Sequence, residues 1–236
     1  MDKLKKQLTK IPGARILDIA TGKGSFIEMI MQLSDTYSEI IGIDSSSKAI
    51  EMANNSISDS KVTFAKMDIN KMTFEQNSFD IVCLSNSMHH MGDINDCIDK
   101  MIKMVKPDGI ILFNEMISDN KDEKQNTHTY MHHFWAEIDR LKDVVHKETM
   151  ERQEILDVFN NHPNVLIDQT WDLEFGEEQE LTKETYDWLK NTLDRSLDRI
   201  KDHPDYKLFE KRAQQLKKRL DTVGFRAATQ IILVAK

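Results

Sequence analysis

Short apolar runs and amphipathic stretches alternate along the first half of the chain. The run at 79–84 is almost entirely apolar, which is typical of a strand buried on both faces of a parallel sheet. Between the runs, apolar residues recur three and four positions apart, as in the stretch that follows Gly24. We therefore expect an α/β fold whose first five strands lie at 15–19, 39–43, 62–65, 79–84 and 105–113.

The second half predicts two helical insertions. A polar segment at 117–126 precedes a helix at 127–146, followed by a helix near 151–160 and a strand at 164–175. Two more helices end at Gly224, before a closing strand at 227–235. We expect one domain over 1–236, with a helical lid insertion at 118–150 and another helical insertion at 177–222. The stripe of the 127–146 helix comprises Met131, Phe134, Trp135, Ile138, Leu141 and Val145.

Composition narrows the class of protein. The 236 residues suffice for a single domain with a sizeable core, and no run of about 18 apolar residues indicates a membrane span. The net charge of −8 argues against a nucleic-acid partner. Cys83 and Cys97 both fall at apolar positions, which indicates packing and a reducing compartment. We expect a cytoplasmic monomer or homodimer with no nucleic-acid or membrane partner.

The segment from Arg15 to Gly24 carries the strongest chemical signal. A strand leads into Asp18 and then into a loop with Gly22 and Gly24, where a ligand can approach the backbone closely. Asp44 ends the second strand about 20 residues past the loop, which suits a pair of ribose hydroxyls. These features predict a nucleoside-binding unit, although either acid taken alone could be a helix cap.

The ligand of this unit is not expected to be a dinucleotide cofactor. That fingerprint requires a third small residue three positions after the second glycine, and Ile27 stands there. The negative charge of Asp18 would also repel a pyrophosphate. A cationic cofactor such as S-adenosylmethionine meets neither obstacle.

The spacing of Asp18, Ala20, Gly22 and Gly24, with Asp44 downstream, resembles that of the Rossmann-like S-adenosylmethionine-dependent methyltransferases. Many members have glycine in place of Ala20. The Ser-Asn-Ser-Met-His-His loop at 85–90 resembles the ubiquinone/menaquinone-biosynthesis branch, and the turn at 105–113 also matches the family. The resemblance covers 14–117, the expected cofactor-binding core. It implies a seven-stranded, mostly parallel sheet whose last strand is antiparallel and pairs with the sixth at the edge.

The resemblance also implies a set of cofactor contacts. An acid at the position of Asp68 contacts the adenine amino group, and the next residue, Ile69, lies against the ring. S-adenosylmethionine, with S-adenosylhomocysteine as product, would be held by Asp18, Ala20, Gly22, Gly24, Asp44, Ser45, Asp68, Ile69 and Ser85.

The catalytic candidates follow from where ligands bind in such sheets. Residues just past the fourth and fifth strands, which are Asn86, His89, His90 and Glu115, should face the methyl group. The sulfonium methyl is already activated, so the enzyme chiefly positions an acceptor, and His89 or His90 is the best candidate for a base. A sulfur or selenium anion would need no base.

The 127–146 helix adds a flank of histidines beside Trp135. We expect this helix to lie over the carboxyl edge of the sheet as a lid, with Trp135 and His128 or His132 facing an acceptor cavity. His128 and His132 could also chelate a metal with His89 or His90, but Asp139 lies about 10.5 Å along the axis from His132 and cannot join them. A cavity-lining or surface role is favoured, so no metal is predicted.

Three functions are consistent with the sequence. The favoured one is methyl transfer from S-adenosylmethionine to a small-molecule acceptor held under the helical lid. The alternatives are a catalytically silent S-adenosylmethionine-binding module and a nicotinamide-dependent oxidoreductase, the second disfavoured by Ile27 and Asp18. The sequence identifies neither the acceptor nor the atom that is methylated.

Overall fold

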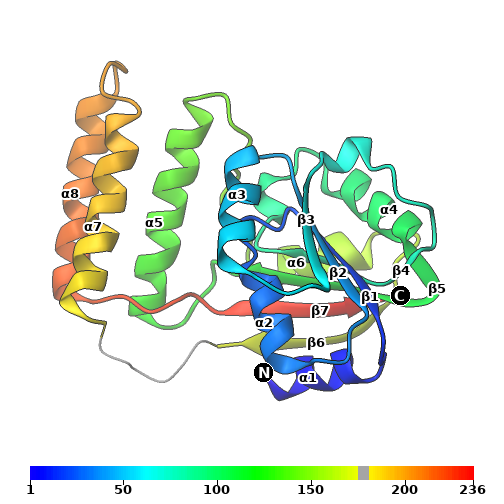
Figure 1. Ribbon diagram of the computed structural model, residues 1–236. Helices are drawn as coiled ribbons and strands as arrows, with labels where there is room; N and C mark the ends of the chain where they lie inside the picture. The colour runs from blue at the N-terminus through cyan, green and yellow to red at the C-terminus, as the bar shows by residue number, and fades with distance from the viewer. Residues whose placement is uncertain (175–180) are drawn as a thin grey trace.

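The computed structural model describes residues 1–174 and 181–236 and contains one seven-stranded sheet (Figure 1). The strand order is β3-β2-β1-β4-β5-β7-β6, and β7 is antiparallel to both of its neighbours. The predicted α/β fold and the antiparallel last strand are confirmed. The strands are β1 (Arg15–Ile19), β2 (Glu39–Asp44), β3 (Val62–Lys66), β4 (Phe79–Ser85), β5 (Val105–Met116), β6 (Ile167–Leu173) and β7 (Gln230–Ala235).

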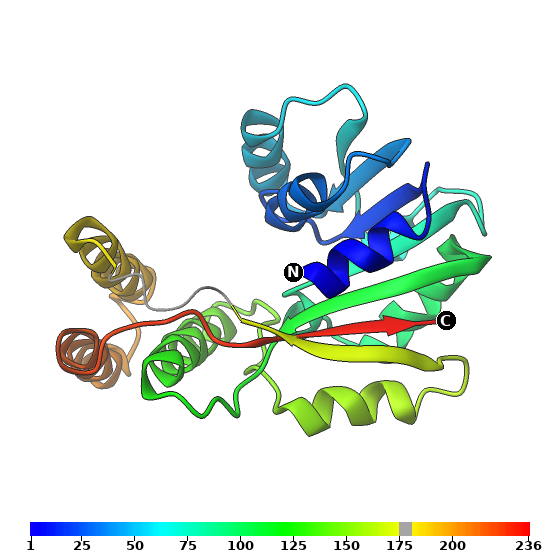
Figure 2. The same cartoon turned by 90° about the horizontal axis from the view of Figure 1, so that it is seen from below.

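The sheet is covered by helices on both faces (Figure 2). Helices α1 (Asp2–Thr9), α2 (Ser25–Leu33) and α3 (Ser47–Ser56) lie on one face, and α4 (Ile94–Met104) and α6 (Arg152–Asn160) lie on the other. Apolar residues of each strand alternate between the two hydrophobic clusters, with Leu17 in one and Ile16 in the other. Helix α1 was not predicted, yet Leu4 and Leu8, four positions apart in a charged segment, are buried against the sheet.

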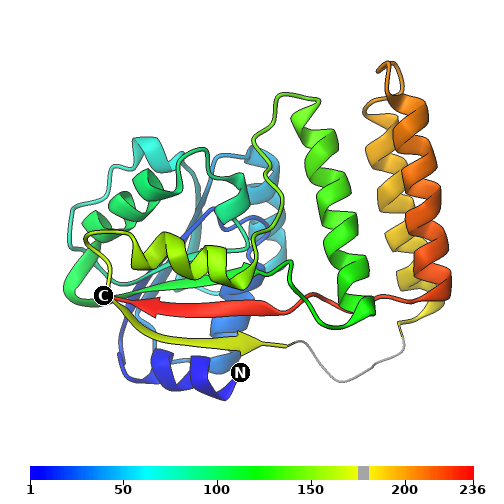
Figure 3. The ribbon, with the colours of Figure 1, turned by 180° about the vertical axis from the view of Figure 1, so that it is seen from behind.

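Three further helices form a group beyond the carboxyl ends of the parallel strands (Figures 1 and 3). Helices α5 (Glu123–Arg140), α7 (Lys183–Asp198) and α8 (Tyr206–Thr222) pack around a third hydrophobic cluster that includes Met131, Phe134, Leu193 and Phe209. Helix α5 stands between the sheet and the other two helices. Both helices predicted within 177–222 are present; residues 177–180, and the predicted strand end at 175, lie outside the described residues.

The predicted bounds of the 127–146 helix are wrong at both ends. Helix α5 starts at Glu123, because Asp122 caps it, and ends at Arg140. Asp143 then adopts a left-handed conformation with φ of 58°, and the amide of Val144 donates to the carbonyl of Asp139, which closes the helix end. Residues 144–150 are therefore not helical, and Val145 is exposed rather than part of the apolar stripe.

Two 3-10 turns complete the part of the fold that borders the sheet edge, η1 (Ile69–Lys71) and η2 (Met88–His90). The second follows β4 directly and places two neighbouring histidines at the carboxyl end of the sheet. Among the residues that the structure describes, no helix is long and apolar enough to cross a membrane.

Candidate active site

The glycine-rich loop between β1 and α2 has an unusual backbone. Ala20, Gly22 and Gly24 have φ of 53°, 56° and 88°, a region that favours glycine. A Cβ on Gly24 would lie 2.9 Å from Cδ1 of Ile57 and 3.3 Å from the Phe64 ring, so Gly24 lets the loop pack closely against its neighbours. A Cβ on Gly22 would meet nothing within 4 Å, because Gly22 borders an open cavity.

Asp18 is a buried acid at the end of β1. Its Oδ2 accepts a 2.6 Å hydrogen bond from Oγ1 of Thr21, whereas its Oδ1 is buried without a hydrogen-bond partner. Burial raises the pKa of Asp18 to about 7; the carboxylate of Asp44 adds to the rise, and the Thr21 bond opposes it. A cation placed in the cavity beside Oδ1 would supply the missing partner and favour the ionised form.

Asp44 ties the glycine loop to the start of α3. Its Oδ2 accepts from the Gly22 amide at 2.9 Å and its Oδ1 accepts from the Ser46 amide at 2.8 Å. Asp68 caps the 3-10 turn η1 in a similar way, accepting from the Asn70 amide at 2.8 Å. Both acids therefore have local structural roles, and both also line the same cavity.

The cavity has a volume of about 870 Å³ and lies at the carboxyl ends of β1, β2 and β4. Of the predicted cofactor residues, only Gly24 does not line it, since its role is packing. The cavity is also lined by Asn86 and His90 of the loop after β4, and by Val144 and Val145 of the segment after α5. The predicted residues that it brings together are Asp18, Ala20, Gly22, Asp44, Ser45, Asp68, Ile69 and Ser85.

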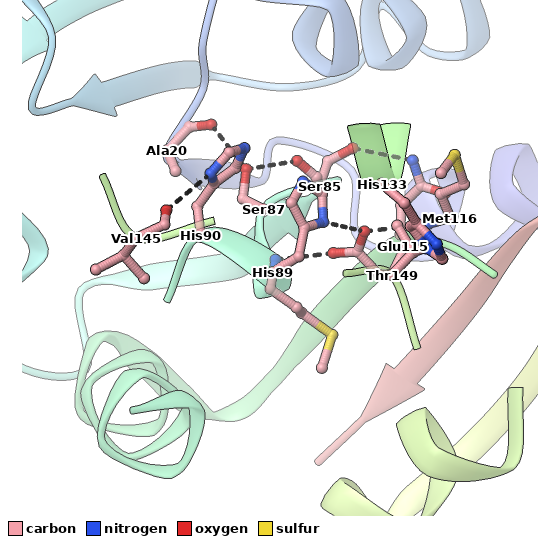
Figure 4. Close-up of polar contacts among 12 residues, drawn as sticks. Ala20, Ser85, Ser87, His89, His90, Glu115, Met116, His133, Val145 and Thr149 are labelled. Atoms are coloured by element: carbon pink, nitrogen blue, oxygen red, sulfur yellow. Dashed lines mark hydrogen bonds and ion pairs between the residues drawn. The ribbon is translucent and has the colours of Figure 1, made fainter. Parts of the chain in front are cut away.

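The loop after β4 is held by Glu115, near the end of β5 (Figure 4). The buried Glu115 carboxylate accepts from the Met88 amide at 2.8 Å through Oε2 and from Nδ1 of His89 at 2.9 Å through Oε1. Glu115 and His89 do not line the cavity. Glu115 was predicted to face the methyl group; the structure instead gives it a positioning role, because it fixes the loop and the orientation of the His89 ring.

His90 differs from His89 because its side chain borders the cavity. Its Nδ1 lies 3.3 Å from the Val145 carbonyl, which can only accept, so Nδ1 carries the proton and Nε2 carries a lone pair (Figure 4). Burial lowers the pKa of His90 to about 4, helped by the neighbouring rings of His89 and His146. The ring is therefore neutral at pH 7.

His128 and His132 of α5 have different surroundings. Nδ1 of His128 accepts a 3.0 Å hydrogen bond from the Ala228 amide, and the ring packs against Phe225 and does not line the cavity. The ring of His132 lies next to that of His89, with centroids 4.6 Å apart. His128 and His132 therefore do not share a ligand, although their spacing of four suggested that they could.

Two further expectations for this region need correction. Trp135 packs against the third hydrophobic cluster and does not line the cavity. His146, which was placed on the helix, lies in the segment after it, with its ring 4.9 Å from His132 and 5.3 Å from His89. No sequence signal marks His146, because its place depends on the turn at Asp143.

A methyltransferase-domain family model matches residues 10–192, most of the chain. The chain belongs to this family. The prediction of a Rossmann-like S-adenosylmethionine-dependent methyltransferase is thus confirmed for family and fold, and S-adenosylmethionine is the cofactor of this class.

Curated relatives match a limited part of this methyltransferase. The protein YqeM of Bacillus subtilis (strain 168), whose name gives it as a methyltransferase, is 31% identical over 105 residues, which cover 42% of this chain and 41% of YqeM. The ubiquinone/menaquinone biosynthesis C-methyltransferase UbiE of Ectopseudomonas mendocina (strain ymp) is 26% identical over 108 residues, which cover 44% of this chain and 42% of UbiE. The chain thus spans less than half the length of these relatives.

A solved structure matches the whole methyltransferase. It is a SAM-dependent methyltransferase from Thiobacillus denitrificans in complex with S-adenosyl-L-homocysteine, with a TM-score of 0.61 and 16% identity, covering 100% of this chain and 89% of that chain. At this identity the likeness establishes the fold alone. The nicotinamide alternative is not favoured, since the side chain of Ile27 is 0% exposed in the core where the dinucleotide fingerprint needs a small residue.

Proposed function

We propose that this methyltransferase transfers the methyl group of S-adenosylmethionine to a small-molecule acceptor. One observation carries the proposal: Asp18, Asp44 and His90 line one and the same cavity. Its volume of about 870 Å³ is in the range of pockets that take small ligands. A net charge of −8 is unfavourable for a nucleic-acid substrate.

The residues around the cavity fit the cofactor. The unpartnered Oδ1 of Asp18 suits the cofactor's ammonium group, and Asp44 at the end of β2 suits the ribose hydroxyls. Asp68 and Ile69 are assigned to the adenine amino group and ring, respectively. Bound there, the cofactor supplies an activated methyl group, whose bond to sulfur breaks with the electron pair left on sulfur.

His90 is assigned as the proton acceptor. Its Nε2 carries a lone pair and the ring borders the cavity, so the geometry supports a proton acceptor beside the site of methyl transfer. As the acceptor atom forms its bond to the methyl carbon, its proton passes to Nε2 of His90. Asn86, with a buried Oδ1 that has no hydrogen-bond partner, is available to orient the acceptor.

The lid is assigned mainly to the segment after α5 rather than to the helix itself. Val144 and Val145 line the cavity, and the Lys147 amide donates a 2.8 Å hydrogen bond to the His89 carbonyl. The segment thereby joins the loop after β4 to the group formed by α5, α7 and α8 (Figures 1 and 3). Such a cover excludes water and limits the size of the acceptor.

Two measurements test the proposed function. Calorimetric titration with S-adenosylmethionine and with NADH should show binding of the first only. Formation of S-adenosylhomocysteine should then be followed with acceptors that present thiol, hydroxyl, amine and enolisable carbon groups. Binding without turnover across the whole panel would refute the enzymatic assignment and favour a silent binding module.

A variant pair tests the role of His90. His90→Ala should lower turnover at least about 100-fold, the usual contribution of a positioned base, with little change in S-adenosylmethionine affinity. His203→Ala, between α7 and α8, is the matched control and should retain full turnover. Equal turnover in both variants would show that His90 is not the base.

A further inference from the structure

Three histidine rings converge beside the cavity. His89 follows β4, His132 comes from α5 and His146 from the segment after α5, and one ring nitrogen from each lies within 4.8 Å of the other two. His89 and His146 are buried, and His132 is partly buried. The rings come from three separate parts of the chain, so neither helix periodicity nor local sequence accounts for their meeting.

The hydrogen bonds leave unpartnered nitrogens in this group. Nδ1 of His132 and Nε2 of His146 are both buried without a hydrogen-bond partner. Burying such groups unpaired is unfavourable, and native structures normally provide a partner. A surface role, which was one expectation for His132, would leave its nitrogens in contact with water. The arrangement is therefore better explained by a ligand that accepts several nitrogen lone pairs at once.

Two carboxylates orient the rings. Glu115 accepts from Nδ1 of His89 at 2.9 Å, and Asp139 accepts from Nδ1 of His146 at 2.6 Å. The proton is thus on Nδ1 in each case, and Nε2 carries the lone pair. Asp139 is itself held by Arg199 at 2.6 Å. A carboxylate on the far nitrogen is the usual support of a histidine that binds a metal, because it fixes the tautomer and the ring direction.

We propose that His89, His132 and His146 bind a divalent transition-metal ion, with Zn²⁺ as the best match. Glu115 and Asp139 would orient His89 and His146, respectively, through hydrogen bonds to Nδ1 without contacting the ion. Three neutral imidazoles and one open position are the composition of a catalytic zinc site. Tetrahedral Zn²⁺ with bonds of about 2.05 Å sets the nitrogens ~3.4 Å apart. The rings would therefore draw together by up to ~1.4 Å from their spacing of at most 4.8 Å.

The His90 ring lies between the three histidines and the cofactor cavity. The His90 ring lies 4.4 Å from that of His89 and 4.2 Å from that of His146, and it also borders the cofactor cavity. We assign the open position to the thiol or hydroxyl of the acceptor, a step that rests on the proposed function. Coordination lowers the pKa of that group. His90 would take that proton, and the anion so formed would be the nucleophile for the methyl group.

Metal binding can be tested without turnover. Protein treated with a chelator and then dialysed should bind one Zn²⁺ per chain by calorimetry, and Co²⁺ should give the visible absorption of a tetrahedral complex. His132→Ala should weaken Zn²⁺ binding at least about 100-fold, and Asp139→Asn roughly 10–100-fold. His133→Ala is the matched control, because its Nε2 contacts Oγ1 of Thr149 rather than the cluster.

Folding is checked in the same samples. Zn²⁺ should raise the melting temperature of the wild type and of His133→Ala but not that of His132→Ala, which should still bind S-adenosylmethionine. Absence of stoichiometric Zn²⁺ binding by the wild type would overturn the site. Unchanged affinity in His132→Ala would do so too, since the ion would then be bound elsewhere.

Turnover separates this inference from the proposed function. The metal-loaded enzyme should methylate thiol or hydroxyl acceptors, and the metal-free enzyme should lose that activity and regain it with Zn²⁺. Full turnover by the metal-free enzyme would overturn acceptor coordination. Stoichiometric Zn²⁺ binding with no turnover on any acceptor would refute the proposed function and leave the metal site standing.

Discussion

The buried carboxyl of Asp18 should make S-adenosylmethionine binding depend on pH. Burial raises the pKa of Asp18 to about 7, so this carboxyl is mostly protonated in the cofactor-free protein in mildly acidic solution. The cofactor's ammonium group favours the carboxylate, so binding below pH 7 must release the proton. Affinity is therefore expected to rise with pH over the range in which Asp18 ionises in the free protein.

The size of the effect follows from the fraction ionised. With a pKa of about 7, Asp18 is ~3% ionised at pH 5.5 and about half ionised at pH 7. Binding that requires the carboxylate should be roughly 15-fold tighter at pH 7, or ~1.6 kcal/mol. An α-amino group has a pKa of about 7.7–8.0, so the cofactor stays mostly protonated in this range.

Calorimetry in buffers of different ionisation enthalpy would measure both the affinity and the proton release. We expect nearly one proton released per cofactor bound at pH 5.5. Adenosine lacks the ammonium group and should bind with little pH dependence, and Asp18→Asn should flatten the profile for S-adenosylmethionine. A wild-type profile that is equally flat, with no proton release, would show that Asp18 does not contact the ammonium group.

The same carboxyl should affect stability in the opposite direction. Its folded-state pKa is about 7, against 3.8 for an unperturbed aspartic acid, so the folded protein holds the proton more tightly. The stabilisation is fully present below pH 3.8 and is lost as the pH rises through 7. The loss amounts to about 4 kcal/mol for the unliganded protein, and comparison with Asp18→Asn by denaturant unfolding isolates it.

Three further predictions concern single residues. Asp44→Ala should weaken S-adenosylmethionine binding by about 1.5–3 kcal/mol, measured by calorimetry, because it removes hydrogen bonds to a charged group; near-wild-type affinity would contradict the ribose assignment. Gly24→Ala should lower the free energy of unfolding by at least about 1–2 kcal/mol, since φ is 88° and space is lacking; unchanged denaturant midpoints would contradict the loop geometry. Phe134→Ala should cost about 3–5 kcal/mol in the same assay, because its side chain is 0% exposed in the third cluster; a small cost would mean that the helices repack.

The strands, and most of the residues that line the cavity, were predictable because their signals are local. A continuous apolar run such as 79–84 fits few structures other than a buried strand, and an acid or glycine at a strand end is carried to the same edge of the sheet by the fold. The site residues that line the cavity from β1 and β2 therefore needed no information on tertiary contacts.

The region formed by α5, the segment after it and the loop after β4 was less predictable, because its geometry is set by tertiary contacts. The apolar stripe of α5 continues through Leu141 to Val145, so periodicity alone extended the helix past the left-handed turn at Asp143. That error placed His146 on a helix and concealed its approach to His89. Glu115 was predicted to face the methyl group, and only its contacts with His89 and the Met88 amide indicate that it positions the loop instead.

The third hydrophobic cluster is separate from the two that cover the sheet. Its buried residues come from α5, α7, α8 and the turn between α7 and α8, and none belongs to the other two clusters. Separate cores often open as separate units, so we expect the three helices to open with a free energy of their own, which amide hydrogen exchange would resolve. Because His132 of α5 lies beside His89, substitutions in this cluster would then change how often the histidine side of the site opens while the sheet, with its glycine loop, stays closed.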